Sequence, residues 1–461
     1  MPEPQHQSLA SIARNLMLDV VPSYANKIFY SLGFLSMTSL VMLVASGMIM
    51  VFKGPTWWLA DSIGVFVRSA HLWSAQAFIL FIFLHLTIVF LTSGYRPPRR
   101  LTWVIGTCML FLALMEAEFG YGLRGDFSSQ WRALQASDLY NGSGLGRFVN
   151  NLNYAQIYGI HIVLFPLIIL GLLFVHYLLV KMRGIAKPFK KDARYAMVHA
   201  NHAVLFGRGI AVVIAILVLA RLFPSPTIAP ITIQDIARDD PRLMAGTLIA
   251  ELEHTSGTAT YFDSIDPYTY DTASIYVFGP LSQEVVSGNQ TNPLSGFSAL
   301  DANAQSQDIT DAKSYFKANN ALDTKSRNPV IAGTSMLVRM AQSGLYESAL
   351  RQTNPFDQTY ASRFLSDTGV LDAQAQTLGI TTDQYGMLRE ERGIVPPGAW
   401  WLAPLGVLDH TILANDQNQD RDGALILGSC ILLLIAFPYI PVVNRIPEFI
   451  GLDRWIWKTK Q

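Results

Sequence analysis

Four histidines lie in apolar stretches of the sequence at nearly equal spacing. His71 and His85 are fourteen residues apart, and His161 and His176 are fifteen residues apart. A helix turns about 100° per residue, so each pair returns to one helix face, with ~21–23 Å between its two members along the axis. Because the membrane interior penalises unpaired polar groups, two matched pairs of imidazoles indicate a shared chemical role.

That role is predicted to be the axial ligation of haem iron. If the two helices run antiparallel, His71 lies level with His161, and His85 lies level with His176. Two facing imidazoles at each level are typical of haem held inside a helical bundle. The chain has two cysteines and no CxxCH motif, so we predict two non-covalent b-type haems. A hydrogen-bonded core histidine explains one such residue, but it does not explain two matched pairs.

Glycines repeat the same spacing on two other apolar stretches. Gly33 and Gly47 are fourteen residues apart, and so are Gly106 and Gly120. A glycine has no Cβ, which lets a flat macrocycle approach the backbone. Ordinary packing of small residues between helices is the alternative, but the shared spacing favours the haem interpretation.

These residues belong to six apolar stretches, each long enough or nearly long enough to cross a bilayer. The chain is 51% hydrophobic and only 15% charged, which predicts an all-α membrane protein. We expect a four-helix dihaem bundle, two further transmembrane helices and an inserted polar extramembrane domain. The predicted spans are residues 28–52, 69–93, 101–123, 157–181, 207–224 and 423–443.

The charges predict how these stretches are oriented. Basic loops at 94–100 and 181–194 are expected on the negative side of the membrane. Residues 226–420 hold 23 Asp and Glu against 11 Lys and Arg, and they then face the positive, periplasmic or equivalent, side of an energy-transducing inner membrane. The expected organisation is an amphipathic membrane-surface segment (1–27), the four-helix dihaem domain (28–206), a fifth helix (207–225), an acidic insert (226–394), and a loop, sixth helix and inner tail (395–461).

These motifs resemble cytochrome b, the dihaem core subunit of bc1/b6f-type quinol–cytochrome c and plastocyanin reductases. "RSAHLWSAQAFILFIFLHL" (68–86) is similar to the family's second helix, and "YRPPRRLTWVIG" (95–106) to the entry of its third. "HYLLVKMRGI" (176–185), with the fifteen-residue histidine spacing, resembles the b6 branch. "LILGSCILLLIAFPYIPVVNRIPEF" (425–449) is similar to a helix of that branch's companion subunit, here in the same chain.

The resemblance implies further roles and partners. Arg68 would pair with a haem propionate, and "YSLG" (30–33) lacks the cysteine that a covalent third haem needs, so none is expected. The implied partners are a Rieske-type or other iron–sulfur subunit, a cytochrome c-type subunit or acceptor, quinol and membrane lipid, in a homodimeric multisubunit complex. No nucleic acid is expected.

The family's quinol-oxidation motifs are altered in this sequence. "GYGLRGDFSSQW" (120–131) has Arg-Gly-Asp where the family has Pro-Trp-Gly, and in "PPGAWWLAP" (396–404) Ala399 stands at the proton-accepting glutamate. Quinol oxidation needs an aromatic slot and a proton acceptor. We expect the slot to be supplied by Tyr121, Trp131, Trp400 and Trp401. Glu118, or as second choice Glu116, would accept protons; the alternative is that these glutamates pair with Arg124 or Arg132.

The sequence therefore predicts the cytochrome b subunit of a bc1/b6f-like respiratory complex, in which two b haems carry electrons from quinol across the membrane. It would be the membrane subunit of a quinol oxidoreductase and not a complete enzyme alone. The altered motifs and the large insert leave open a non-bifurcating dihaem conduit that links the quinone pool to another redox module. A proton-conducting transporter without haem is the third class.

Overall fold

The computed structural model describes residues 19–187, 195–261, 270–288, 291–352, 355–380 and 398–451. Most of the predicted amphipathic segment at 1–27 lies outside these residues. The chain divides into two compact units. We call residues 1–118, 161–225 and 427–461 the membrane unit, and residues 119–160 and 226–426 the insert unit.

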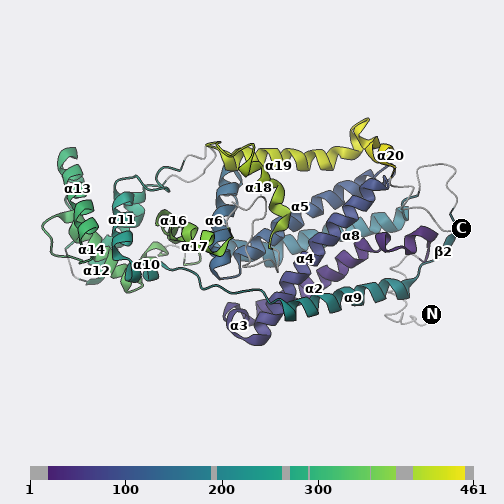
Figure 1. Ribbon diagram of the computed structural model, residues 1–461, viewed down its shortest axis with the longest axis horizontal. Coiled ribbons are helices and arrows are strands. Elements are labelled where there is room, and N and C mark those ends of the chain that lie inside the picture. Colours follow the sequence, from purple (N-terminus) through teal and green to yellow (C-terminus); the bar gives the residue numbers. More distant parts are fainter. Residues whose placement is uncertain are drawn as a thin grey trace, which may run out of the picture. The chain divides into compact units, whose positions relative to one another are not determined.

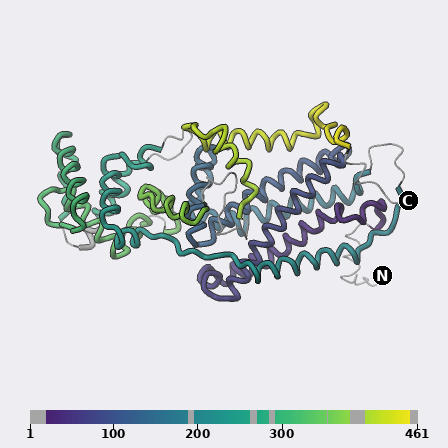
Figure 2. The backbone as a smooth tube through the Cα atoms, in the orientation of Figure 1, coloured from purple at the N-terminus to yellow at the C-terminus, as the bar shows by residue number. Residues whose placement is uncertain are grey.

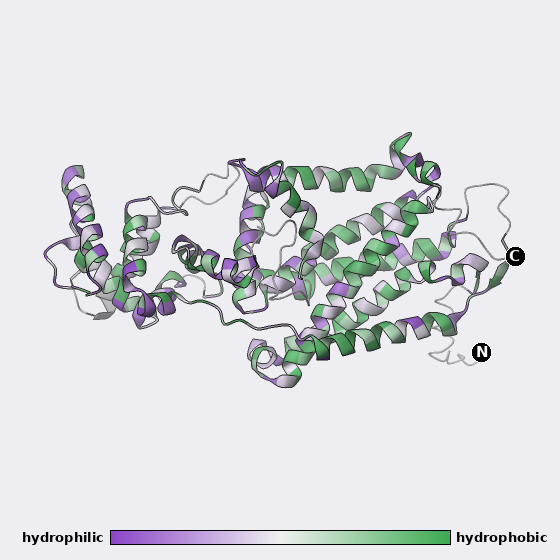
Figure 3. Ribbon diagram, in the orientation of Figure 1, coloured by the Kyte–Doolittle hydropathy of each residue, from purple (hydrophilic) through white to green (hydrophobic). Residues whose placement is uncertain are grey.

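Six helices in the described part of the chain are long and apolar enough to cross a membrane, which confirms the predicted all-α membrane fold. Their surfaces are mainly hydrophobic (Figure 3). They are α2 (Leu32–Lys53), α4 (Ser62–Leu91), α5 (Arg100–Gly122), the run α7 (Tyr154–Gly159), η4 (Ile160–Leu164) and α8 (Phe165–Arg183), α9 (His202–Leu222), and α19 (Gln419–Ala436) continued by η8 (Phe437–Tyr439).

Helices α2, α4 and α9 pack against one another in the membrane unit, where they run side by side (Figure 1). The short helix α3 (Pro55–Ala60) precedes α4, and the Asp61 carboxylate caps α4 by accepting hydrogen bonds from the amides of Ile63 and Gly64. Two short strands, β1 (Val20–Pro22) and β2 (Met197–His199), pair antiparallel and join the segments before α2 and α9.

The end of the sixth span is fixed to the third span by an aromatic cluster of the membrane unit. Phe437 packs with Tyr95 and Trp103, whose ring centroids lie 5.2 Å apart. The Trp103 indole donates a hydrogen bond to the Leu434 carbonyl at 2.8 Å, and the Tyr95 hydroxyl donates to the Asn444 carbonyl at 2.7 Å. Burial raises the pKa of Tyr95, so its hydroxyl stays a donor at neutral pH.

The insert unit is built from short helices around one hydrophobic core. Their course along the chain can be followed in Figure 2. The helices are α6 (Phe127–Gly142), α10 (Ile233–Asp239), α11 (Pro241–Leu252), η5 (Ser274–Phe278), α12 (Gly279–Gly288), α13 (Ala302–Ala318), α14 (Pro329–Gln342), α15 (Leu345–Leu350), α16 (Thr359–Asp367), α17 (Val370–Leu378) and α18 (Ala403–His410), with single turns at η3 (Leu145–Arg147), η6 (Phe297–Ala299) and η7 (Trp400–Leu402).

This division differs from the predicted domain boundaries, because residues 119–160 belong with the insert and not with the four-helix domain. Phe127 and Leu134 of α6 are buried in the core of the insert unit. The Tyr154 amide donates to the Phe356 carbonyl at 2.9 Å, and the Gln358 amide donates to the Leu152 carbonyl at 2.7 Å. Backbone pairing and apolar burial therefore join this loop to the insert.

Two carboxyl groups of the insert unit lie at the ends of α11 and α16. Glu251 is fully buried, and an oxygen of its carboxyl group accepts a hydrogen bond from Ser256 Oγ at 2.6 Å. Asp367 accepts one from the Thr258 amide at 2.8 Å. Burial, and then the charge of Asp367, raise the pKa of Glu251 well above its ordinary 4.5. The folded protein therefore holds a proton that the unfolded chain releases.

The stability of the insert unit should consequently decrease as the pH rises above about 5. At pH values between the pKa of Glu251 in the unfolded chain and its raised pKa in the folded protein, unfolding releases one proton. The free energy of unfolding therefore falls by up to about 1.4 kcal/mol per pH unit. We expect Glu251→Gln to flatten this dependence. Thermal unfolding of the detergent-solubilised protein between pH 5 and about 8, followed by circular dichroism, measures it. An equal slope in the variant and the wild type would contradict the assignment.

Candidate functional site

All four paired histidines lie in membrane helices of the membrane unit. His71 and His85 are on α4, His161 is in the π-helical turn η4, and His176 is on α8. A π turn takes one more residue than an α turn. This extra residue explains why one pair is fifteen residues apart and the other fourteen: the π turn brings the longer spacing back onto one face.

The rings of His71 and His161 face each other from α4 and η4, with centroids 6.3 Å apart and planes at 75°. Two imidazoles on opposite sides of one metal, each bonded at about 2 Å, have a similar separation of ~6 Å between ring centroids. Among the described residues no three His, Cys, Asp or Glu side chains form a metal-binding group.

Hydrogen bonds fix which nitrogen of each facing ring is available. His71 Nδ1 lies 3.1 Å from the Leu43 carbonyl and 3.0 Å from Ser46 Oγ. His161 Nδ1 lies 3.0 Å from both the carbonyl and the carboxylate of Glu116. A carbonyl accepts only, so each Nδ1 carries the proton and each Nε2 keeps a free lone pair. This pattern is typical of metal-ligating histidines.

Three of the four predicted glycines contact these rings. A Cβ on Gly47 would lie 3.3 Å from His71 Cε1, and one on Gly33 would lie 3.4 Å from His85 Cε1. A Cβ on Gly106 would lie 3.3 Å from Cε1 of His176. Relaxed carbon contacts are ~3.5–4.0 Å, so any larger residue would push the imidazole aside. The glycines thus leave room for the histidine rings beside them.

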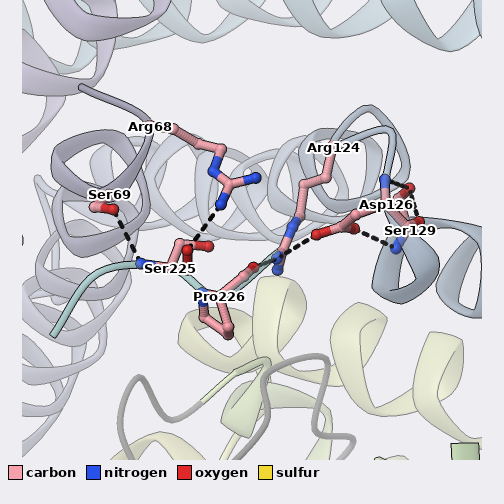
Figure 4. Close-up of polar contacts among 7 residues, drawn as sticks. All are labelled: Arg68, Ser69, Arg124, Asp126, Ser129, Ser225 and Pro226. Carbon is pink, nitrogen blue, oxygen red and sulfur yellow. Dashed lines mark hydrogen bonds and ion pairs between the residues drawn. The ribbon is translucent and has the colours of Figure 1, made fainter. Parts of the chain in front are cut away.

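Arg68 is buried on α4, three residues before His71, and its guanidinium donates to the Ser225 carbonyl at 2.7 Å (Figure 4). The Ser225 amide donates to Ser69 Oγ at 2.9 Å. These two bonds fasten the end of the segment after α9 to α4. They also hold a cationic side chain one helical turn from a ligand candidate.

The altered Arg-Gly-Asp motif has a structural role inside the insert unit. Arg124 forms an ion pair of 2.8 Å with Asp126 and donates to the Pro226 carbonyl at 2.8 Å (Figure 4). Asp126 and Ser129 form a reciprocal capping box that starts α6. Gly125 has φ +76°, a conformation that favours glycine. Within the insert unit Arg124 therefore pairs with Asp126.

The aromatic candidates for a quinol slot cluster in the insert unit. The rings of Tyr121 and Trp401 have centroids 6.2 Å apart, and those of Trp400 and Trp401 are 5.7 Å apart. Tyr121, Trp401 and Ala399 are all buried. The structure thus brings together residues that are nearly 280 positions apart in the sequence.

The two glutamate candidates lie on the part of α5 that belongs to the membrane unit. Glu118 is buried, and Glu116 contacts His161. Sequence reasoning missed that contact, and it missed Ser46 beside His71. The available signal was that Ser46 directly precedes Gly47, which already appeared in the glycine pattern.

The structure is that of a helical membrane protein whose membrane unit carries two pairs of histidines on its membrane helices. A family profile described as "Cytochrome b(N-terminal)/b6/petB" matches residues 76–234. Cytochrome b6 of Heterocapsa triquetra is 31% identical over 206 residues, 39% of this chain and 94% of the relative. Cytochrome b6 of Heliobacterium modesticaldum is 29% identical over 208 residues, 40% of this chain and 98% of the relative. The chain therefore belongs to the cytochrome b/b6 family, as the resemblance indicated.

A solved chain titled "Hyperthermophilic respiratory Complex III" also aligns with this protein, at a TM-score of 0.39 and 15% identity. The alignment covers 79% of this chain and 98% of the other. The curated relatives match only about two fifths of the present sequence. The family profile ends at residue 234, in the first turn of α10.

Proposed function

We propose that this protein is the dihaem subunit of a bc1/b6f-like quinol oxidoreductase complex and carries electrons across the membrane. The observation that supports this most strongly is the hydrogen bonding of the facing pair. In His71 and His161, carbonyl groups hold the Nδ1 protons and leave both Nε2 atoms free to bind a metal. Membership of the cytochrome b/b6 family supports the same function.

His71 and His161 would hold one b haem, and His85 and His176 would hold the second. A bound haem supplies reversible one-electron transfer. Hydrogen bonds orient the rings of His71 and His161, and the glycines leave room for the rings beside them. The buried Arg68 guanidinium would pair with a propionate of the haem.

Quinol would bind where Tyr121, Trp400 and Trp401 gather, since flat aromatic rings stack on a quinol ring. Glu118 is the proposed proton acceptor, because it is a buried carboxylate two residues before Gly120. The acidic insert unit would lie on the positive side of the membrane. An iron–sulfur subunit and a cytochrome c-type partner would complete a homodimeric complex.

A redox-titrated visible spectrum of the purified complex tests this function. We expect two b-type components with separate midpoints, both reducible by quinol. Bifurcation further requires that an outer-site inhibitor blocks electron delivery to the iron–sulfur partner. Quinol reduction of both haems without such a partner would support the non-bifurcating conduit. Protein without any haem absorbance would refute both proposals and favour a transporter.

A further inference from the structure

The two rings of the facing pair have chemically different partners. His71 Nδ1 meets neutral groups, the Leu43 carbonyl at 3.1 Å and the Ser46 hydroxyl at 3.0 Å. His161 Nδ1 meets the carboxylate of Glu116, whose Oε1 lies 3.0 Å away. Both Glu116 and His161 are largely buried, with 18% and 19% of their side chains exposed. Only one of the two rings is thus hydrogen-bonded to a formally anionic group.

The contact between Glu116 and His161 is set by both the backbone and the side chain. The Glu116 carbonyl oxygen lies 3.0 Å from the same Nδ1, so one N–H faces two acceptors of a single residue. The π turn at Ile160–Leu164 presents His161 to this point of α5. A carboxylate in a membrane helix is costly unless it has a partner, and a ring N–H is such a partner.

We infer that Glu116 is a positioning residue that lowers the reduction potential of the haem held by His71 and His161. The inference rests on the proposed haem ligation and gives Glu116 a role other than proton acceptor for quinol. A carboxylate that accepts the Nδ1–H bond increases the electron donation of Nε2 to the metal. Stronger donation stabilises ferric iron over ferrous iron, which lowers the potential.

Glu116→Gln tests the inference, because glutamine keeps the length and an acceptor oxygen but removes the charge. The backbone carbonyl still holds the ring, so the haem should remain bound. We expect the midpoint of one haem to rise while the other stays unchanged. A ten-fold change in its ferric–ferrous equilibrium corresponds to 59 mV for one electron. Redox titration of the purified protein, with electron paramagnetic resonance of the ferric haems, measures the effect.

Two matched variants make the result specific. Glu118→Gln removes a carboxylate from the same helix two residues away, and it should shift this midpoint less. Glu116→Asp keeps the charge and should keep the midpoint nearer to the wild type. If Glu116→Gln loses haem, the midpoint measured in Glu116→Asp tests the inference instead. Unchanged midpoints in Glu116→Gln, or equal shifts in Glu116→Gln and Glu118→Gln, would overturn the inference. Wild-type protein without haem would instead refute the proposed function.

Discussion

A His71→Leu variant should purify with one b haem fewer than the wild type, which we propose holds two. Leucine preserves the apolar packing of α4 but offers no nitrogen to the metal. The ring of His161, 6.3 Å away between centroids, would then be a single ligand, while the His85 and His176 level stays intact. The haem-to-protein ratio and the number of components in a redox titration measure the loss.

Glycine variants provide a control that leaves every histidine in place. Gly47→Leu places side-chain atoms against His71 Cε1, where even a Cβ would be 3.3 Å away, so it should lose the same haem. A Cβ added to Gly171 on α8 would have no neighbouring atom within 4 Å. Gly171→Leu should therefore keep the haem content of the wild type. A full haem complement in His71→Leu would show that the histidine is a hydrogen-bonded core residue and not a ligand.

Arg363→Met should destabilise the insert unit by about 3 kcal/mol, because it leaves a partly buried carboxylate without its cation. Arg363 on α16 is buried and forms an ion pair of 2.6 Å with Asp138 on α6. Its guanidinium also lies 5.4 Å from the ring centroid of Tyr261. The Asp138 charge raises the pKa of Arg363 despite burial, so the pair stays charged. Chemical denaturation followed by tryptophan fluorescence measures the change in the free energy of unfolding.

The matched control is another arginine of the same unit. Arg351 lies 3.7 Å from Glu347 in an ion pair in which 32% of the Arg351 side chain is exposed. Solvent screens such a pair, and Arg351→Met should cost less than about 1 kcal/mol. If both variants unfolded at the same denaturant concentration, the bond between α6 and α16 would not be important for the insert unit.

The sequence alone predicted the membrane helices, and it predicted that His71 and His161 lie side by side. Hydropathy and the helical period are local properties, so the predicted span at 28–52 is observed as α2 (Leu32–Lys53) with only small changes at its ends. Family membership followed from these local motifs.

Only the tertiary structure decided the partners of the site residues. Glu116 reaches His161 across 45 positions, and Arg363 reaches Asp138 across 225. Such contacts depend on how helices pack, and no local spacing contains that information. The same holds for the loop at 119–160, which joins the insert because the apolar face of α6 is buried in the core of the insert unit. The π turn at His161 could not be predicted either, since an extra residue in a helix changes neither its composition nor its hydropathy.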